Sequence, residues 1–371
     1  MSRTLLSPRA SLAPAALLAT AIGALLPLTL LPATPSSAAP SARAASTSTS
    51  QKAPSIVRRD VSFLVDNTTT GSGLPCSTDG RAYRVRGTLI GTYDQVNGYD
   101  GGTLTNVLVH DAGTGAWFWD LPSQRRYDYA GGLARAGQLV LVLDRLGYDA
   151  SRLSDGRATC MGAQVSMLHQ VIQKLYGGDY RYVSAKDGPN PPAAQRIVVH
   201  GHGTGAAIAA TEAGRYQDVN GVVLMSWART ASSTAQRELD RQQQQCGSRD
   251  FASFGATRAA FARLLFASAP SAVREAAERR RNGVPCGDVG SQQLLDGTSG
   301  NATQRVTAPV LLLNGTRDAR QAAGSIDAQS RAFPRSRGVS HRTFAGAGSA
   351  LPLEAQAPQV RSAVVRWLRS R

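Results

Sequence analysis

The sequence predicts an α/β fold in which helices cover both faces of a mostly parallel central sheet. Short runs of apolar and β-branched residues recur along the chain with helical stretches between them, as in folds that alternate strands and helices. Most of these runs are too apolar for a sheet with one face in water. Late in the chain a long segment without strand character interrupts the pattern, which indicates an inserted helical lid.

The N-terminal residues 1–44 are typical of a secretory signal peptide. A short basic start leads into an apolar run that contains prolines and ends in small residues. Cleavage after Ala44 fits the small-x-small rule, and cleavage after Ala38 is the alternative. A retained membrane anchor is the rival interpretation, because the run is about long enough to span a bilayer. We expect a secreted, extracellular protein in which residues 45–57 form a disordered Ser/Thr-rich tether.

The four cysteines favour two disulfides over free thiols, because their number is even and the chain carries an export signal. Four cysteines allow three pairings. We favour Cys76 with Cys160 and Cys246 with Cys286, because the last two flank the inserted helical segment. No two cysteines are near neighbours in the sequence, so we expect them to form no metal site.

The chain is strongly basic, with a formal net charge of +16 that falls to +13 when the three arginines of residues 1–44 are removed. A basic exported protein can adhere non-specifically to anionic cell-surface polymers. The arginines are scattered, and the densest cluster is only Arg279-Arg280-Arg281. Since no basic helix with interleaved aromatic residues appears, we expect no specific recognition of nucleic acid.

Seven runs are predicted to be strands, and four stretches outside the insertion are predicted to be helices. The first two strands alternate polar and apolar residues and are expected to form an antiparallel pair: Asp60–Val65 and Tyr83–Ile90. The other five are expected in the buried centre of the sheet: Asn106–His110, Leu139–Leu143, Ile197–His200, Gly221–Met225 and Val310–Leu313. The helices are expected near 163–175, 206–213, 326–332 and 359–368.

The domain is expected to span 58–371, with a lid insertion at about 228–306. Within the insertion Ala, Arg, Gln and Glu replace the strand pattern, and three helical segments are predicted: 234–245, 257–267 and 271–282. An insertion at this point would lie over the carboxyl ends of the strands. Lids control access, so we expect this segment to shape a substrate pocket.

The most informative segment runs from Arg196 to Arg215, through a short apolar strand, a glycine-rich turn and a helix of small residues. This is the layout of the G-x-S-x-G nucleophile elbow, in which a serine carries the attacking oxygen. Here the turn reads Gly201-His202-Gly203-Thr204-Gly205. Gly203 therefore stands where the nucleophile is expected.

Four further motifs occur in the matching order. They are His110-Asp-Ala-Gly-Thr-Gly-Ala-Trp-Phe-Trp119, Asp144-Arg-Leu-Gly-Tyr-Asp-Ala-Ser151, Leu313-Asn-Gly-Thr-Arg-Asp318 and Phe344-Ala-Gly-Ala-Gly-Ser-Ala-Leu351. With the elbow, they make the chain from about Arg81 to Arg371 resemble the α/β-hydrolase superfamily, and specifically its exported bacterial members. The resemblance implies the α/β-hydrolase fold and an esterase-like hydrolase ancestry.

The departures from the family pattern fall on the chemistry. The resemblance implies that Asp318 is the retained acid, that Gly203 replaces the nucleophile and that Ser349 replaces the histidine. Asp111 replaces a loop glycine and puts a carboxylate where negative charge develops during acyl transfer, which opposes catalysis. Asp149 replaces a second turn glycine. In a serine hydrolase, loss of the nucleophile or the base costs about a factor of a million in rate.

The resemblance also places five residues at the oxyanion hole or the pocket: Asp111, Ala112, Thr204, Trp117 and His202. In the family, the position of Thr204 donates its backbone N–H to the oxyanion, and its side chain points away from the tip of the elbow. For Trp117, a pocket wall and simple packing of the loop onto the sheet are equal alternatives.

A metal site at the sheet edge is the other chemistry to consider. His110, Asp111, Asp144, His200 and His202 all lie near the carboxyl ends of predicted central strands. The family motifs already account for His110 and His202, and we expect no metal and no cofactor. The two remaining histidines, His169 and His341, are expected to be structural.

Two functions are compatible with this sequence. The first is a pseudoenzyme that binds a small apolar or acyl ligand, or a protein partner, in the old pocket. The second is an active esterase-like serine hydrolase that uses a displaced nucleophile and base. Loss of both the serine and the histidine favours the first, because one substitution can be relocated whereas two require a new site.

Overall fold

The computed structural model describes residues 55–100, 104–122, 124–188, 191–227, 230–322 and 324–371. The predicted signal peptide and nearly all of the predicted tether lie outside these residues. Within the described ranges, no helix combines the length and the apolar character needed to cross a bilayer.

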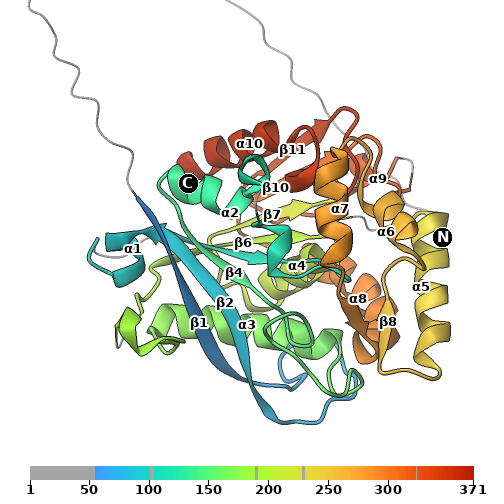
Figure 1. The fold of residues 1–371 in the computed structure, drawn as a ribbon, viewed down its shortest axis with the longest axis horizontal. Helices are drawn as coiled ribbons and strands as arrows, with labels where there is room; N and C mark the ends of the chain where they lie inside the picture. The colour runs from blue at the N-terminus through green and yellow to red at the C-terminus, as the bar shows by residue number, and fades with distance from the viewer. Residues whose placement is uncertain (1–54, 101–103, 123, 189–190, 228–229, 323) are drawn as a thin grey trace, which may run out of the picture. The chain divides into compact units, whose positions relative to one another are not determined.

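A nine-stranded sheet with the order β11-β10-β7-β6-β3-β4-β2-β1-β5 organises the described chain (Figure 1). Its parallel strands are β3 (Leu104–Val109), β4 (Leu139–Leu143), β6 (Arg196–His202), β7 (Gly221–Met225), β10 (Val310–Gly315) and β11 (Val339–Phe344). Antiparallel pairing joins β4 to β2 (Ala82–Thr92), β2 to β1 (Ile56–Asp66) and β1 to β5 (Arg181–Tyr182). The predictions of a mostly parallel sheet and of a leading antiparallel pair are confirmed.

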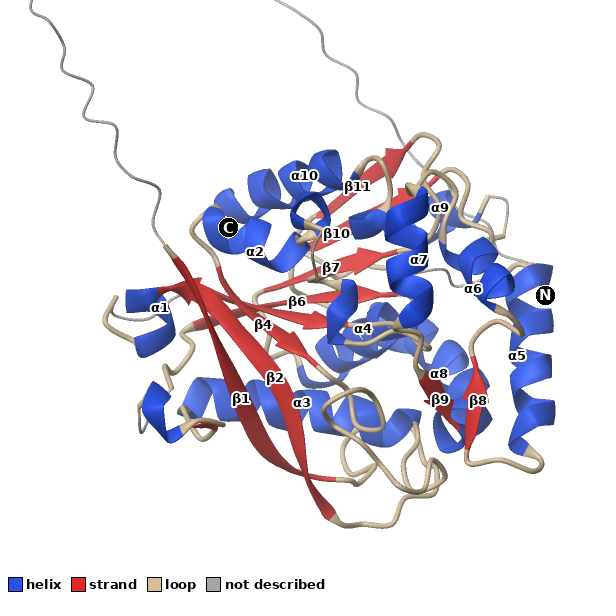
Figure 2. Ribbon diagram, viewed as in Figure 1, coloured by secondary structure: helices blue, strands red, loops and turns tan. Residues whose placement is uncertain are grey.

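Helices cover both faces of this sheet, as predicted (Figure 2). The alternation of side chains along β3 divides the core: Val107 and Val109 face α3 (Met161–Gly177) and α4 (Thr204–Tyr216), whereas Leu108 faces the opposite side. On that opposite side lie α2 (Tyr129–Arg135) and α10 (Ala357–Arg369). Two short α-helices, α1 (Tyr93–Asn97) and α9 (Ser325–Ser330), also lie outside the inserted segment.

The segment between β7 and β10 holds four helices and a small two-stranded sheet. In chain order they are α5 (Ser233–Cys246), β8 (Phe251–Ser253), α6 (Arg258–Leu265), α7 (Ser271–Arg279), β9 (Gly283–Pro285) and α8 (Cys286–Thr303). The sequence did not predict α8. This helix packs so closely on α4 that a Cβ on Gly214 would lie 2.0 Å from the carbonyl oxygen of Ala302. The end of α8 therefore belongs to the scaffold behind the elbow.

Two disulfides brace the described chain in the pairing that the sequence favoured. Cys76 is bonded to Cys160, just before α3, with 6.3 Å between their Cα atoms. Cys246 is bonded to Cys286, with 5.4 Å between their Cα atoms. The second bond joins the end of α5 to the start of α8 and so closes the inserted segment.

Candidate active site

The turn between β6 and α4 has the strained geometry of a nucleophile elbow. Gly203 adopts φ 53° and ψ −118°, a conformation that side chains rarely accept. Its glycine neighbours allow close backbone packing, since a Cβ on Gly205 would lie 2.3 Å from the carbonyl oxygen of Val109. The frame of the elbow is complete, and it presents no side chain at its tip.

The carboxylate of Asp111 fills the space next to Gly203 at the tip of the elbow. Its Oδ1 accepts the backbone N–H of Ala112 at 2.8 Å and that of Thr204 at 2.7 Å. A Cβ on Gly203 would lie 2.3 Å from both Cγ and Oδ2 of the same carboxylate. The backbone N–H groups of Ala112 and Thr204, which the resemblance assigns to an oxyanion hole, are thus already bound, and the space that a side chain at position 203 would need is filled.

Arg320 neutralises this buried carboxylate. Asp111 is 0% exposed, and Nη1 of Arg320 lies 2.6 Å from its Oδ2. Burial by itself raises the pKa of Asp111, but Arg320, His202 and the Thr204 N–H outweigh burial and hold the pKa at about 2. The carboxylate is therefore ionised at neutral pH, and its negative charge lies against the backbone N–H groups of the elbow.

Arg320 also takes over the contacts expected of a catalytic histidine. Its Nη2 donates to Oγ of Ser349, and its backbone N–H donates to Oδ1 of Asp318 at 2.9 Å. Burial raises the pKa of Asp318, and Arg320 opposes that rise. The retained acid thus faces an arginine, which cannot act as a general base because it stays protonated.

Sequence reasoning missed Arg320, although a signal was present. A carboxylate at position 111 in a buried loop needs a nearby cation, because an unpaired buried charge is costly. Arg320 follows the retained acid by two residues, in Asp318-Ala-Arg320. An arginine at that place in the acid loop was the available candidate.

Ser349, His202 and Asp111 form a chain of contacts like that of a catalytic triad, with the imidazole between the hydroxyl and the carboxylate. None of the three stands at the position where the family carries that residue type. Oγ of Ser349 is 3.4 Å from Nε2 of His202, and Nδ1 of His202 is 3.7 Å from Oδ2 of Asp111. The shorter contact of His202 Nε2, at 3.0 Å, is with the carbonyl oxygen of Ser349. Burial lowers the pKa of His202 to about 4, which makes it a weak base. Ser349 is 0% exposed, so a ligand has no direct path to its hydroxyl.

Two further hydroxyls near the elbow are already engaged. Ser226 follows β7 with φ 51° and donates to the carbonyl oxygen of Ser349 at 2.6 Å. Oγ1 of Thr204 donates to Oε1 of Gln292 at 3.4 Å. The partner of the Thr204 hydroxyl is thus an amide oxygen, whereas the Ser226 hydroxyl also interacts with the Asp318 carboxylate and lowers the pKa of that group.

The remaining two residues assigned to the pocket by sequence pack in the core. Trp117 is buried and contacts Phe118 edge to face. The ring of His202 stacks on the ring of Phe118 with 4.3 Å between the ring centroids. Neither is among the described residues that line the cavity below. Both side chains are thus packed among core residues, and their assignment to the oxyanion hole or the pocket stays a prediction.

The histidines at the sheet edge have separate partners, and they gather around no common point. His200 and His202 are two residues apart on β6 and face the same side. Yet His200 bonds Tyr129 through Nδ1 and Asn106 through Nε2, both at 3.0 Å, and burial lowers its pKa to about 3. Nε2 of His110 accepts the backbone N–H of Arg145 at 3.1 Å. Each ring is thus held as a structural neutral imidazole.

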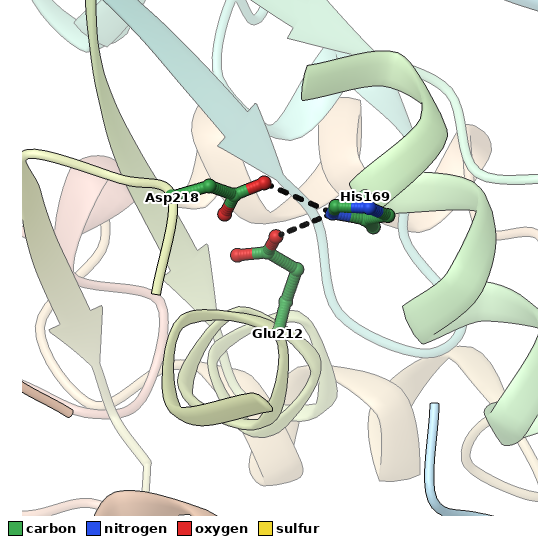
Figure 3. Close-up of side chains that lie close together, drawn as sticks. All are labelled: His169, Glu212 and Asp218. Carbon is green, nitrogen blue, oxygen red and sulfur yellow. Dashed lines mark ion pairs between the residues drawn. The ribbon is translucent and has the colours of Figure 1, made fainter. Parts of the chain in front are cut away.

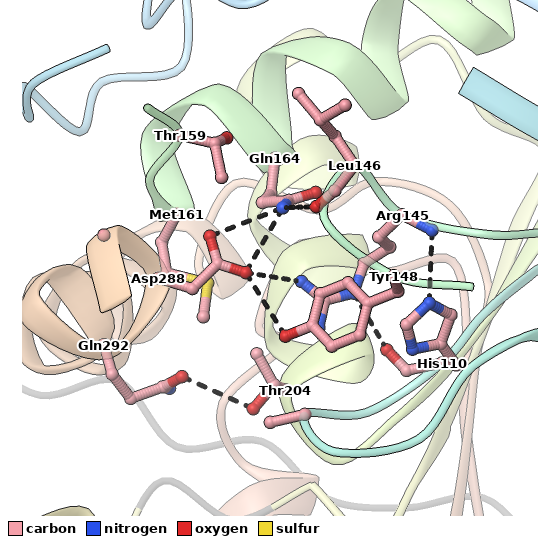
Figure 4. A network of polar contacts seen from close by, with 12 residues as sticks. His110, Arg145, Leu146, Tyr148, Thr159, Met161, Gln164, Thr204, Asp288 and Gln292 are labelled. Atoms are coloured by element: carbon pink, nitrogen blue, oxygen red, sulfur yellow. Dashed lines mark hydrogen bonds and ion pairs between the residues drawn. The ribbon is translucent and has the colours of Figure 1, made fainter. Parts of the chain in front are cut away.

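A buried ion pair lies beside the loop that follows β3 (Figure 4). Asp288 on α8 is 0% exposed, and its Oδ2 lies 3.3 Å from Nη1 of Arg145 and 3.2 Å from Nε2 of Gln164. Nε of Arg145 donates to the carbonyl oxygen of His110 at 3.2 Å. The pair therefore ties the loop after β3 to α3 and α8.

The turn after β4 keeps its shape despite losing a glycine. Asp149 adopts φ 33°, in the left-handed region that favours glycine. Asp144 holds the turn by accepting the backbone N–H groups of Ala116 at 2.7 Å and Ala150 at 3.2 Å. Burial raises the pKa of Asp144 to about 7, against the effect of these hydrogen bonds.

A cavity of about 560 Å³ lies over the elbow, with one wall from α5 and another from α8. Gly203, Thr204, Ala112, Ser226 and Arg320 contribute the part nearest the elbow. The other lining residues are Met161, Ala207, Trp227, Thr230, Ala231, Ala235, Gln236, Glu238, Leu239, Gln242, Phe254, Val284, Val289, Gln292, Gln293 and Asp296. The cavity thus lies directly over the turn whose N–H groups the Asp111 carboxylate accepts.

Comparison with known structures shows the same fold at low sequence identity. A thermophilic esterase from Thermogutta terrifontis aligns with a TM-score of 0.55 and 21% identity, over 83% of this chain and 98% of that one. An esterase from Exiguobacterium antarcticum aligns with a TM-score of 0.58 and 14% identity, over 80% of this chain and 98% of that one. A monoacylglycerol lipase from Paleococcus ferrophilus aligns with a TM-score of 0.55 and 20% identity, over 72% of this chain and 96% of that one. A comparison with curated proteins found no match.

The family model described as the alpha/beta hydrolase family matches residues 107–363, which is more than half of the chain. The matched region begins in β3, includes the elbow and the cavity, and ends in α10. It contains every residue that the resemblance assigns to an oxyanion hole or a triad position. This chain therefore belongs to the alpha/beta hydrolase family.

Proposed function

We propose that this chain is a secreted, catalytically degenerate α/β-hydrolase that binds a small, uncharged acyl ligand in the cavity over the elbow. The observation that carries the proposal is the position of the Asp111 carboxylate. It accepts the N–H groups of Ala112 and Thr204 and fills the space of a nucleophile on Gly203. A protein partner that inserts an apolar side chain is the other ligand class that this cavity fits.

The filled oxyanion hole removes the catalysis that survives in ordinary triad mutants. Such mutants keep an acceleration of about 10³ to 10⁴ over water, which comes from the oxyanion hole and substrate binding. Here both N–H donors bind an ionised carboxylate, so they are not available to a developing oxyanion, and the charge of Asp111 repels it. Turnover should therefore fall below that of a simple nucleophile knockout.

The cavity itself supports ligand binding. Its volume of about 560 Å³ is within the usual range of small-molecule sites, about 300 to 1,000 Å³. Apolar side chains such as Leu239 and Val289 offer a surface for an acyl chain, and the amides of Gln236 and Gln293 offer polar contacts.

The charges around the cavity favour a neutral ligand over a free carboxylate. Arg320 is already paired with Asp111. Glu238 lines the cavity and is paired with Arg241. Burial raises the pKa of Asp296 to about 6, so this lining residue is mostly anionic at pH 7. An anionic ligand would meet like charge without a free cation among the described lining residues.

Export is supported by the two disulfides, which persist in oxidising compartments. Beyond the leader the chain keeps a charge of about +13, given the three arginines of residues 1–44 in a total of +16. We expect this charge to give salt-sensitive, non-specific adhesion to anionic cell-surface polymers.

An active esterase with a displaced nucleophile is the second candidate. The observation in its favour is the Ser349, His202 and Asp111 arrangement, with 3.4 Å between the serine hydroxyl and the imidazole. This candidate requires Ser349 to become accessible and His202 to gain basicity. It predicts turnover that Ser349→Ala abolishes.

A thermal-shift titration tests ligand binding on the secreted mature chain. A medium-chain monoacylglycerol at one hundred times its Kd should raise Tm by about 5 °C or more, whereas the free fatty acid of equal length should raise it far less. Leu239→Trp, which fills the cavity, should abolish the shift, and Leu64→Trp on the exposed face of β1 should not. Absence of any shift with monoacylglycerols and short-chain esters would refute a small acyl ligand.

A further inference from the structure

A second cluster of chemically active side chains lies behind the elbow helix. It consists of His169 on α3, Glu212 on α4 and Asp218 in the turn that follows α4 (Figure 3). None of the three is among the described residues that line the ligand cavity. The cluster is therefore a separate feature of the molecule.

The three side chains converge at distances suited to a metal ion. Nδ1 of His169 lies 2.9 Å from Oδ2 of Asp218 and 3.5 Å from Oε1 of Glu212. One ligand atom from each residue lies within 4.8 Å of the other two. Tetrahedral zinc, with bonds of about 2.0 to 2.2 Å, separates its ligand atoms by about 3.4 Å, which small side-chain rotations would achieve here.

Mutual hydrogen bonding does not satisfy the cluster. Glu212 is 0% exposed, and neither of its carboxylate oxygens makes a hydrogen bond of acceptable geometry. Nδ1 of His169 likewise makes none, despite its short distance to Asp218. Buried carboxylates are normally hydrogen-bonded, paired or bound to a metal. The partners of the buried Glu212 carboxylate are the other two members of the cluster, His169 at 3.5 Å and Asp218, so the three groups share one small space that a cation can fill.

The surroundings orient the ligands and leave a route to solvent. The ring of His169 stacks on Tyr216 with 3.6 Å between centroids, and Asp218 accepts a hydrogen bond from Gln173 at 2.6 Å. Such supporting contacts fix the direction of metal ligands. The side chains of His169 and Asp218 are 25% and 18% exposed, so an ion and a water molecule can reach the site.

Charge in the cluster also favours a cation. The cluster brings two carboxylates and one imidazole together, and the Glu212 side chain is fully buried. A divalent ion at their centre would compensate both carboxylates.

We propose that His169, Glu212 and Asp218 bind one Zn²⁺ ion, with water as the fourth ligand, and that the ion joins α3 to α4 behind the elbow. A nitrogen ligand with two carboxylates suits zinc better than magnesium or calcium, which prefer six or more oxygen ligands. Because the water position faces solvent and not the ligand cavity, the site stabilises the scaffold.

Zinc titration of the untagged mature chain, stripped of metal, tests this proposal. Isothermal calorimetry should give one Zn²⁺ per chain with release of at least one proton. Saturating Zn²⁺, at one hundred times Kd, should raise Tm by about 5 °C or more. Co²⁺ should give the visible absorption of tetrahedral cobalt, whereas Mg²⁺ should not change Tm.

Glu212→Gln and Asp218→Asn should each weaken Zn²⁺ binding at least about tenfold and remove the cobalt spectrum. Both replacements keep the shape of the side chain, and Glu212→Gln should not lower the Tm of the metal-free protein, because burial raises the pKa of Glu212 to about 8 and the amide imitates its neutral form. The exposed pair of Lys174 and Asp179 supplies the control, since Asp179→Asn should leave binding unchanged. Absence of stoichiometric binding, or binding that survives both replacements in folded protein, would overturn the proposal.

Discussion

Introducing a serine at the elbow should destabilise the native protein more than it restores any chemistry. The Cβ of Gly203→Ser would lie 2.3 Å from Cγ and from Oδ2 of Asp111 and 2.4 Å from Oδ1. Gly203 also has a positive φ of 53°, which strains any side chain. Removal of Asp111 by itself is not the remedy, because it leaves the mostly buried guanidinium of Arg320 without its partner. The useful background is Asp111→Gly with Arg320→Gln.

The size of the effect follows from these two causes. Overpacking against a fixed neighbour costs about 1 to 3 kcal/mol, and the strained backbone costs about 1 to 3 kcal/mol more. Gly203→Ser should therefore lower the free energy of unfolding by about 2 to 6 kcal/mol in the native chain. In the Asp111→Gly/Arg320→Gln background only the backbone strain remains. The coupling between the two sets of changes should be about 1 to 3 kcal/mol.

Urea unfolding of the four proteins of this cycle, followed by circular dichroism, measures the coupling. Additive losses would show that the Asp111 carboxylate does not fill the elbow, and the reasoning would fail. A second arm adds Ser349→His to the folded triple variant, which supplies the base beside Asp318. Ester turnover should rise only in this quadruple variant, because an unassisted serine hydroxyl is a weak nucleophile.

Three further predictions concern stability. Non-reducing peptide mapping should recover Cys76 with Cys160 and Cys246 with Cys286. Replacing the second pair by alanine should lower the free energy of unfolding by about 4 kcal/mol, given its sequence separation of 40. A loss near zero would contradict the role of this bond in closing the inserted segment. Asp288→Ala should lower the free energy of unfolding by about 3 to 5 kcal/mol, because it leaves Arg145 buried and unpaired. Asp250→Ala, in the exposed pair with Arg157, should lower it by less than about 1 kcal/mol. Similar losses for the two variants would contradict a structural role for the buried pair. Burial raises the pKa of Glu212 from 4.5 to about 8, so the folded state loses stability relative to the unfolded state as pH rises through this range. In metal-free protein, the amount by which the Tm of Glu212→Gln exceeds that of the native chain should grow from about pH 5 to pH 8. A difference in Tm that stays constant with pH would refute the shift.

Apolar periodicity predicted the central strands well, because buried parallel strands are defined by their own residues. The predicted Gly221–Met225 coincides with β7, and Val310–Leu313 forms most of β10. The edge strand β5 has only two residues, and its pairing with β1 depends on the tertiary fold. A pattern of that length carries no periodic signal.

Helices that depend on packing were missed. The sequence of α8 contains several glycines, serines and threonines, which are poor helix formers. It is helical because it packs closely on α4, where Ala302 meets Gly214. The helix α2, with Gly131 and Gly132 in its centre, was missed for the same reason. Local propensity was overridden by burial in both elements.

The positions of the candidate site were predictable from the sequence, whereas the contacts between their side chains were not. Motif order placed Gly203, Ser349 and Asp318 at the former triad, and the structure brings the three elements together around Arg320. The sequence indicated that Asp111 would oppose an oxyanion. It did not indicate that the carboxylate accepts both N–H donors, because that depends on a side-chain rotamer and on a cation from a distant loop.

Fluorophosphonate labelling of the native chain is the most direct test of the central claim that the filled oxyanion hole has ended catalysis. Intact mass spectrometry after prolonged reaction should show no labelled protein, while an active esterase treated in parallel is fully labelled. Stoichiometric labelling mapped to Ser349, Ser226 or Thr204, and lost when that residue is replaced by alanine, would contradict the account and establish a displaced nucleophile.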